Sequence, residues 1–121
     1  MSDLDMNAYQ KAAKSTAESL TLDHFAYGLL EEAGEVAGIL KRFHRGDEDY
    51  WDLNIHRTHY EEELSAAAKA KLRAELGDVL WYVAMLANLL DISLSEVAEQ
   101  NLEKLQDRAK RNVIQGSGDN R

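Results

Sequence analysis

The sequence predicts an all-α protein that folds as a single four-helix bundle. The chain contains no proline, and its commonest residues, Leu, Ala and Glu, are strong helix formers. Apolar residues recur at the i, i+3 and i+4 spacing of amphipathic helices. A chain of 121 residues, of which 45% are hydrophobic, is long enough for one domain with a real core.

The first two helices are expected over residues 5–19 and from Thr21 or Asp23 to Phe43. Thr21 and Asp23 can each cap the free amides of a first turn. Gly46 follows at the position where a left-handed glycine ends many helices. The inner stripe of the first helix is Met6, Tyr9, Ala13 and Ala17. The apolar arc of the second is Phe25, Leu29, Val36, Ile39, Leu40 and Phe43.

The third and fourth helices are expected over residues 60–90 and 93–113. Ser93 and Glu96 have the spacing of a capping box. From Val79 to Leu90 the third helix is apolar almost all round, which is typical of a helix buried on every side. Trp81, on its far side, then indicates a contact between subunits. The core stripe of the third helix is Leu72, Leu76, Val79, Val83, Leu86 and Leu90, and that of the fourth is Leu94, Val97, Ala98 and Leu105.

These helices define one domain, residues 1–113, followed by a tail. Residues 44–59 are interpreted as an inserted loop or lid, because they are too aromatic for a plain linker. Residues 114–121 are polar and glycine-rich, which favours a disordered tail.

Two pairs of carboxylates stand three residues apart, so that each pair shares one face of a helix. They are Glu32 with Glu35 and Glu75 with Asp78. Glu32 lies in the middle of the apolar arc of the second helix, where an unpaired carboxylate is rarely tolerated. A solvated charged face explains either pair alone but not Glu32. The pattern therefore favours a divalent metal site between the two helices.

Polar residues also line the core side of the fourth helix. Asn101, Lys104 and Arg108 follow one another at i, i+3 and i+7. Such cations can bind a phosphate, although alone they fit an ordinary amphipathic boundary equally well. Tyr82, one turn beyond Asp78, is either a core residue or a contact to a base or sugar. His24 is either a substrate contact or a capping residue.

The bulk composition excludes several classes of protein. A net charge of −8 argues against a nucleic-acid-binding protein. The absence of cysteine excludes disulfides and thiol nucleophiles. The N-terminus lacks the basic and apolar regions of a signal peptide, and the longest apolar stretch, residues 79–87, is too short to span a membrane. A cytoplasmic protein is expected.

The paired motifs resemble the signature of the MazG-like nucleoside triphosphate pyrophosphohydrolases, in the all-α NTP pyrophosphatase superfamily. The resemblance rests on Glu31-Glu32-x-x-Glu35 and Glu75-x-x-Asp78. It extends through residues 22–28 before the first motif and to Asn101, Lys104 and Arg108, covering most of residues 5–110. The segment 44–59 has no counterpart in the family pattern.

The resemblance implies an oligomeric bundle, a homodimer or homotetramer, that hydrolyses deoxy or noncanonical nucleoside triphosphates to monophosphate and pyrophosphate. Mg²⁺, or Mn²⁺ in its place, is the implied cofactor, held by Glu32, Glu35, Glu75 and Asp78. Glu31 is implied as an outer carboxylate that orients or deprotonates the attacking water. The implied substrate contacts are Asn101, Lys104, Arg108, Tyr82 and His24.

Two other functions compete with this one. A non-catalytic helical bundle that binds a partner protein predicts that the carboxylates are dispensable. A di-iron carboxylate bundle needs Glu-x-x-His pairs, and neither acidic motif has a histidine at that offset. The di-iron interpretation is therefore disfavoured.

Overall fold

The computed structural model describes residues 4–47 and 64–120, which form four α-helices and no β-strand. The prediction of an all-α fold is confirmed. The helices are α1 (Met6–Lys14), α2 (Leu22–Arg45), α3 (Ala66–Leu89) and α4 (Leu94–Lys110). Most of the inserted segment 44–59 lies outside the described residues, as does Tyr60. The predicted start of the third helix is nevertheless too early, because Ser65 caps α3 and the helix begins at Ala66.

Helix α1 is shorter than the sequence predicts, because its last turn is closed by hydroxyl groups. It begins at the cap Asp5, whose carboxylate accepts a hydrogen bond from the Ala8 amide at 2.7 Å. It ends at Lys14 instead of residue 19. The hydroxyls of Ser15 and Thr16 donate to the Ala12 and Ala13 carbonyls at 2.6 and 2.7 Å, which competes with continued helical bonding.

The predicted caps of α2 and α4 are confirmed, although α2 ends at Arg45 and not at the predicted Phe43. Of the two candidate caps for α2, Thr21 is the one used, and its hydroxyl accepts from the His24 amide at 3.3 Å. Gly46 ends α2 in the left-handed region, with φ of 88°. The Ser93 hydroxyl accepts from the Glu96 amide at 3.3 Å at the start of α4.

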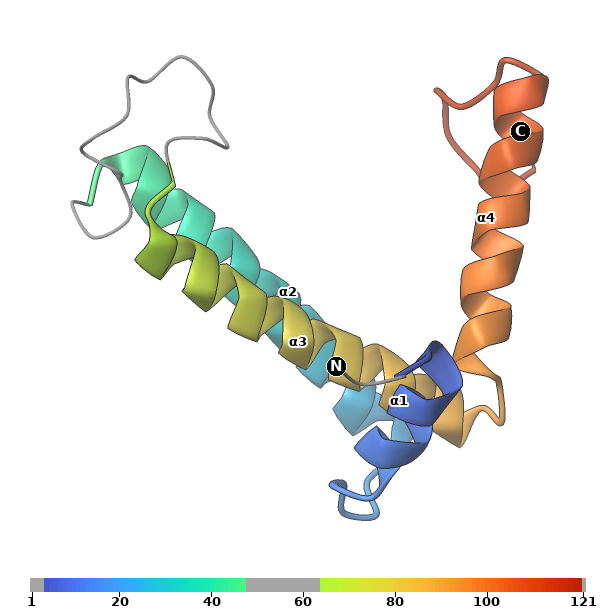
Figure 1. The fold of residues 1–121 in the computed structure, drawn as a ribbon, viewed down its shortest axis with the longest axis horizontal. Coiled ribbons are helices and arrows are strands. Elements are labelled where there is room, and N and C mark those ends of the chain that lie inside the picture. The colour runs from blue at the N-terminus through green and yellow to red at the C-terminus, as the bar shows by residue number, and fades with distance from the viewer. Residues whose placement is uncertain (1–3, 48–63, 121) are drawn as a thin grey trace.

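Helices α2 and α3 lie side by side as an antiparallel hairpin, with α1 packed near one end (Figure 1). Each end of the hairpin has its own buried cluster. At the end nearer the insertion the cluster is Ile39, Phe43, Leu64 and Ala68. At the other end it is Ala13, Phe25, Ala84, Met85 and Leu94. The middle of the hairpin, where both acidic motifs lie, is thus held from both sides.

The buried face of α3 differs from the predicted stripe. Leu76 and Leu90 are 56% and 53% exposed, whereas Ala84 and Ala87 are buried. Small side chains such as alanine allow neighbouring helices to approach closely. A prediction based on hydropathy instead assigns the more apolar leucines to the buried face. Trp81, which the sequence predicts to lie between subunits, has contacts within its own chain as well, and its role between subunits stays a prediction. Its ring packs edge-on against Phe25 and its Nε1 donates to the Thr16 hydroxyl at 2.9 Å.

Helix α4 projects away from the hairpin, bent by 105° from α3 (Figure 1). Its first turn is fixed by α1. The buried Gln10 amide donates to the Ile92 carbonyl and accepts from the Leu94 amide, both at 2.8 Å. Leu94 is buried as predicted, but Val97 and Leu105 are 42% and 39% exposed, because the hairpin does not continue beneath them.

No single helix of the described residues has the length and apolar composition needed to cross a membrane. Only α3 and α4 taken together, as a bent pair, pass that test of length and composition.

Candidate functional site

Three of the predicted metal ligands converge in the middle of the hairpin. Oxygens of Glu32 on α2 and of Glu75 and Asp78 on α3 all lie within 4.8 Å of one another. Glu32 and Glu75 are half-buried and Asp78 is exposed. This group is called the carboxylate cluster below. The i, i+3 spacing on α3 places Glu75 and Asp78 on the face that meets α2.

The carboxylate cluster carries negative charge that repels itself. Burial is the largest of the effects that raise the pKa of Glu32, followed by the negative charge of Asp78. A hydrogen bond with Glu75, and the charges of Glu75 and Glu31, raise that pKa further. Every one of these contributions disfavours the ionised carboxylate. A bound cation would lower the pKa of Glu32 again, because it stabilises the ionised carboxylate.

A close approach of the two helices lies beside this cluster. Gly28 on α2 faces the ring of Tyr82 on α3, and an added Cβ would collide with that ring, 2.7 Å from Cδ1. The lack of a side chain at Gly28 therefore lets Tyr82 occupy this space. Tyr82 also packs against Phe25 and Trp81 at centroid distances of 6.2 and 5.0 Å. It is half-buried, one turn beyond Asp78.

Helix α1 brings Tyr9 near the same carboxylates. Burial, and then the negative charge of Asp78, raise the pKa of the Tyr9 hydroxyl. The sequence identified Tyr9 only as an apolar position of the first helix. Spacing along one helix cannot reveal a contact between residues so far apart in the chain, so no sequence signal marked it.

The remaining acidic candidates on α2 lie outside the cluster. Glu35 and Glu31 are exposed, and Glu31 acts on the cluster through the effect of its charge on Glu32. His24 is exposed in the first turn of α2, where its backbone amide is capped by Thr21 and its ring lies edge-on to Phe25 at 5.7 Å. His24 is therefore not the capping residue of α2, because Thr21 takes that position, and its role as a substrate contact stays a prediction.

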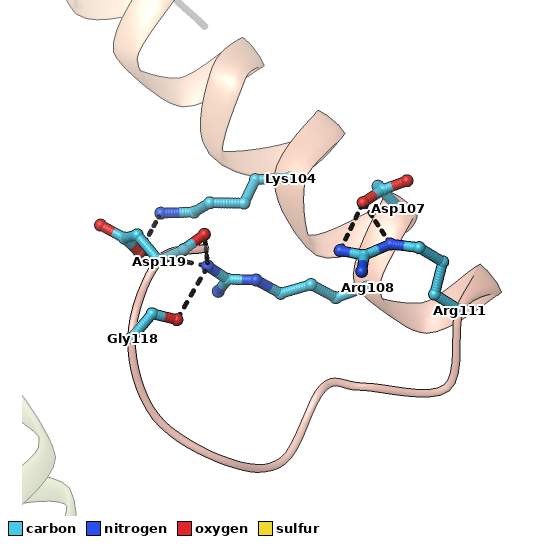
Figure 2. Close-up of polar contacts among 6 residues, drawn as sticks. All are labelled: Lys104, Asp107, Arg108, Arg111, Gly118 and Asp119. Carbon is cyan, nitrogen blue, oxygen red and sulfur yellow. Dashed lines mark hydrogen bonds and ion pairs between the residues drawn. The ribbon is translucent and has the colours of Figure 1, made fainter. Parts of the chain in front are cut away.

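The predicted phosphate contacts lie on α4, which projects away from the hairpin that carries the cluster (Figure 1). Asn101 and Lys104 line a hollow of about 420 Å³, together with Val97 and Gln100. Arg108 is only 4% exposed. Its guanidinium and the Lys104 ammonium both contact the carboxylate of Asp119, in the tail (Figure 2). Lys104 and Arg108 are called the basic pair below.

A larger hollow of about 500 Å³ lies between α1 and the turn from α3 to α4. Asn7, Gln10, Lys11, Asn88 and Ser93 are among its lining residues. Gln10, Asn88 and Ser93 take part in hydrogen bonds that join α1 to α3 and α4. Because the carboxylate cluster does not line it, we assign this hollow to the packing of the helices and not to the chemistry.

Comparison with known proteins identifies the family. The family model of the MazG nucleotide pyrophosphohydrolase domain matches residues 20–113. The chain belongs to the MazG family. The matched region contains α2, α3 and α4, and with them the carboxylate cluster and the basic pair. The resemblance inferred from the two acidic motifs is confirmed.

Two curated proteins are similar to this MazG chain. The Gene 37 protein of Mycobacterium phage L5 is 41% identical over 127 residues, covering 98% of this chain and all of the relative. The uncharacterized protein YvdC of Bacillus subtilis (strain 168) is 34% identical over 80 residues, covering 66% of this chain and 68% of the relative. No solved structure matches the chain at a significant level.

The carboxylate cluster suits the divalent cations on which MazG-like enzymes generally depend. Its donors are carboxylate oxygens, the hard ligands that Mg²⁺ prefers. One of them, Glu32, is half-buried among like charges. The residues present therefore fit a divalent metal ion.

Proposed function

We propose that this protein hydrolyses nucleoside triphosphates, deoxy or noncanonical ones, to the monophosphate and pyrophosphate with Mg²⁺ as cofactor. The observation that carries the proposal is the convergence of Glu32, Glu75 and Asp78 within 4.8 Å. Membership of the MazG nucleotide pyrophosphohydrolase family supports it. Mn²⁺ can replace Mg²⁺ in a site of this kind, since it also accepts carboxylate and water ligands.

The proposed reaction is an attack of water at the α-phosphorus. The water oxygen bonds to that phosphorus, the bond to the bridging oxygen breaks, and pyrophosphate leaves with the electron pair. Mg²⁺, when bound, would supply charge neutralisation on the phosphate oxygens. Glu32, Glu75 and Asp78 would hold it, with Glu35, which lies outside the carboxylate cluster, as the fourth proposed ligand. Glu31, or Glu32 itself, orients the water and accepts its proton.

The substrate is held by residues from two parts of the chain. Asn101, Lys104 and Arg108 contact phosphate or sugar, since Lys and Arg donate charge-assisted hydrogen bonds to phosphate oxygens. Tyr82 and His24 are proposed to contact the nucleoside. Tyr82 is the better supported of the two, because it lies one turn from Asp78 and is only half-buried.

We further propose that the active form is a homodimer or homotetramer. Apolar residues are exposed on three helices: Tyr27 and Leu30 on α2, Leu76 and Leu80 on α3, and Val97, Leu102 and Leu105 on α4. A second copy that covers these faces would remove them from water and would give the projecting α4 a partner. Light scattering at micromolar concentration tests this proposal, and a monomer would contradict it.

A panel of nucleoside triphosphates with Mg²⁺ tests the activity. The panel includes common, deoxy and damaged nucleotides, and the products are separated. Monophosphate with pyrophosphate from a subset of the panel is the expected result. Diphosphate with phosphate would contradict attack at the α-phosphorus. The matched controls are the Glu32→Gln variant and the wild-type protein with excess chelator.

The exposed apolar residues of α4 also favour a second candidate function, a non-catalytic bundle that binds another protein. Leu102 is 56% exposed on a helix that leaves the rest of the chain. If folded, metal-loaded protein turns over no member of the panel, this second function is the one to pursue.

A further inference from the structure

The C-terminal tail turns back along α4 and contacts the basic pair (Figure 1). The chain reverses direction through three residues with positive φ: Asn112 at 62°, Gly116 at 115° and Gly118 at 84°. Asparagine and glycine adopt this region more readily than other residues. The Val113 amide donates to the Arg108 carbonyl at 2.9 Å, which closes the end of the helix. These residues thus permit the return of the tail, which the composition alone predicted to be disordered.

The tail places a carboxylate between both members of the basic pair. Asp119 Oδ1 lies 3.1 Å from Lys104 Nζ and 3.1 Å from Arg108 Nη2 (Figure 2). The same Nη2 donates to the backbone carbonyls of Asp119 at 3.0 Å and Gly118 at 3.5 Å. Hydrogen bonds from Lys104, and then from Arg108, lower the pKa of Asp119, so this carboxylate is ionised at neutral pH.

The contact leaves Arg108 incompletely satisfied. The Arg108 side chain is 5% exposed and its Nε is buried without a hydrogen-bond acceptor. Asp119, in contrast, is 81% exposed and is therefore easily displaced. A phosphate group has the geometry to accept from Nε and Nη2 of one guanidinium together. The basic pair is thus an anion-binding position that the tail fills only in part.

We propose that the tail is an autoinhibitory strap, in which Asp119 occupies the place of a substrate phosphate on Lys104 and Arg108. This inference rests on the proposed function, which assigns the basic pair to phosphate. A phosphate group binds there only after the strap has left. The strap therefore lowers the apparent affinity for phosphate in proportion to the fraction of molecules in which it is closed.

Two variants open the strap in different ways, and a third is a matched control. Asp119→Asn removes the charge that competes with phosphate. Gly118→Ala leaves the charge unchanged but strains the tail, because an alanine disfavours φ of 84° although its Cβ meets nothing within 4 Å. Asp107→Asn is the control: it also removes one carboxylate near the end of α4, but Asp107 pairs with Arg111 and not with the basic pair (Figure 2).

The first measurement is the affinity for inorganic pyrophosphate by calorimetry in metal-free buffer, which keeps the carboxylate cluster from contributing through bound Mg²⁺. Asp119→Asn and Gly118→Ala should bind pyrophosphate roughly three- to tenfold more tightly than wild type, as expected for the loss of an exposed competing ion pair. Asp107→Asn should match wild type. Equal or weaker binding by Asp119→Asn would overturn the proposal.

A second measurement follows the tail directly in the wild-type chain. With ¹⁵N-labelled protein, the amide signals of Gly116 and Gly118 should move to the positions of an unstructured segment as pyrophosphate is added. Signals that keep their folded positions at saturation would also overturn the strap.

These measurements separate the strap from the proposed function. Tighter pyrophosphate binding by the two open variants, without turnover of any nucleotide, would support the strap and defeat the proposed function. Normal turnover, with the same KM and the same pyrophosphate affinity in wild type and Asp119→Asn, would support the function and defeat the strap.

Discussion

The carboxylate cluster on the hairpin and the basic pair on α4 differ in how their charges are balanced. Glu32, Glu75 and Asp78 bring like charges together, and every contribution from their surroundings raises the pKa of Glu32. Lys104 and Arg108 have a counterion within the chain, Asp119. The chain thus leaves the charges of the first region to repel one another, whereas it balances those of the second with a carboxylate of its own.

The difference indicates what each region requires from a ligand. A metal ion entering the cluster relieves a repulsion that already exists, so its binding adds stability. A phosphate entering the basic pair replaces an existing contact, so the net gain is smaller. We therefore expect changes in the cluster to have larger effects than changes in the basic pair.

The largest effect is expected for Glu32→Gln. Loss of a ligand from the cluster should reduce turnover by about 1000-fold, since several kcal/mol of charge stabilisation depend on the metal. Without metal the variant should be more heat-stable than wild type at pH 7, because the ionised Glu32 repels its neighbours. Turnover and melting temperature, each with and without Mg²⁺, are the measurements.

The pH dependence of stability tests whether the ionised Glu32 is the cause of this difference in heat stability. The pKa of Glu32 is raised in the folded state, so its ionisation penalises folding at neutral pH. This penalty falls as the pH drops through the folded pKa, and is gone below the unfolded value of about 4.3. The stability advantage of Glu32→Gln should vanish over the same range. Glu99→Gln, an exposed change on α4, is the control, and full activity in Glu32→Gln would refute the site.

The next effect is expected for Arg108→Gln. Loss of its charged hydrogen bonds to phosphate should lower kcat/KM by about 10- to 100-fold, in line with the energy of such bonds. Steady-state kinetics with the preferred nucleotide measure this change. Arg111→Gln is matched in chemistry and lies on the same helix end, but it pairs with Asp107. Equal losses in both variants would mean that Arg108 has no special role.

A moderate effect on stability is expected for Gly28→Ala, which forces α2 away from Tyr82. Overpacking of this kind costs about 1–3 kcal/mol, and the displaced helix should weaken Mg²⁺ binding as well. Gly77→Ala is the contrast, because its Cβ would meet nothing within 4 Å. It should add about 0.5–1 kcal/mol in the middle of a helix. Urea unfolding and Mg²⁺ titration measure both variants, and similar stability in the two would contradict the close approach.

The smallest effect is expected for Ser93→Ala. The change removes the cap of α4 and the hydrogen bond from the Ser93 hydroxyl to Asn7 Oδ1, at 2.8 Å. Loss of a cap costs about 1 kcal/mol, which urea unfolding can resolve. The carboxylate cluster should keep its affinity for Mg²⁺. A loss of Mg²⁺ affinity as large as that of Gly28→Ala would show that the two regions are coupled.

Most of the hairpin could be predicted because its signals are local. The i, i+3 spacing of Glu75 and Asp78, the position of Glu32 in an apolar arc, and the caps at Thr21 and Ser93 each depend on a few neighbouring residues. Glu35 falls at the edge of that arc, and its exposure in the structure agrees with this position. Its role as a metal ligand stays a prediction.

The direction of α4 could not be predicted, because it depends on contacts between distant parts of the chain. Asn7 and Gln10 hold the start of α4, and neither residue carries a signal in its own helix beyond polarity. The buried face of α3 could not be predicted for a different reason. When nearly every residue is apolar, periodicity does not distinguish Ala84 from Leu90. Which of them is buried then depends on the shape of the neighbouring helices.

The bonds from Gln10 to Ile92 and Leu94 join residues 82 and 84 positions apart, and we expect this separation to set an order of folding. The hairpin can close from α2 and α3 alone, whereas α4 takes its direction only after α1 has closed the much longer loop. The carboxylate cluster should therefore form before the basic pair has been placed relative to the hairpin. A metal ion that binds at that stage would stabilise the hairpin before the rest of the chain has folded.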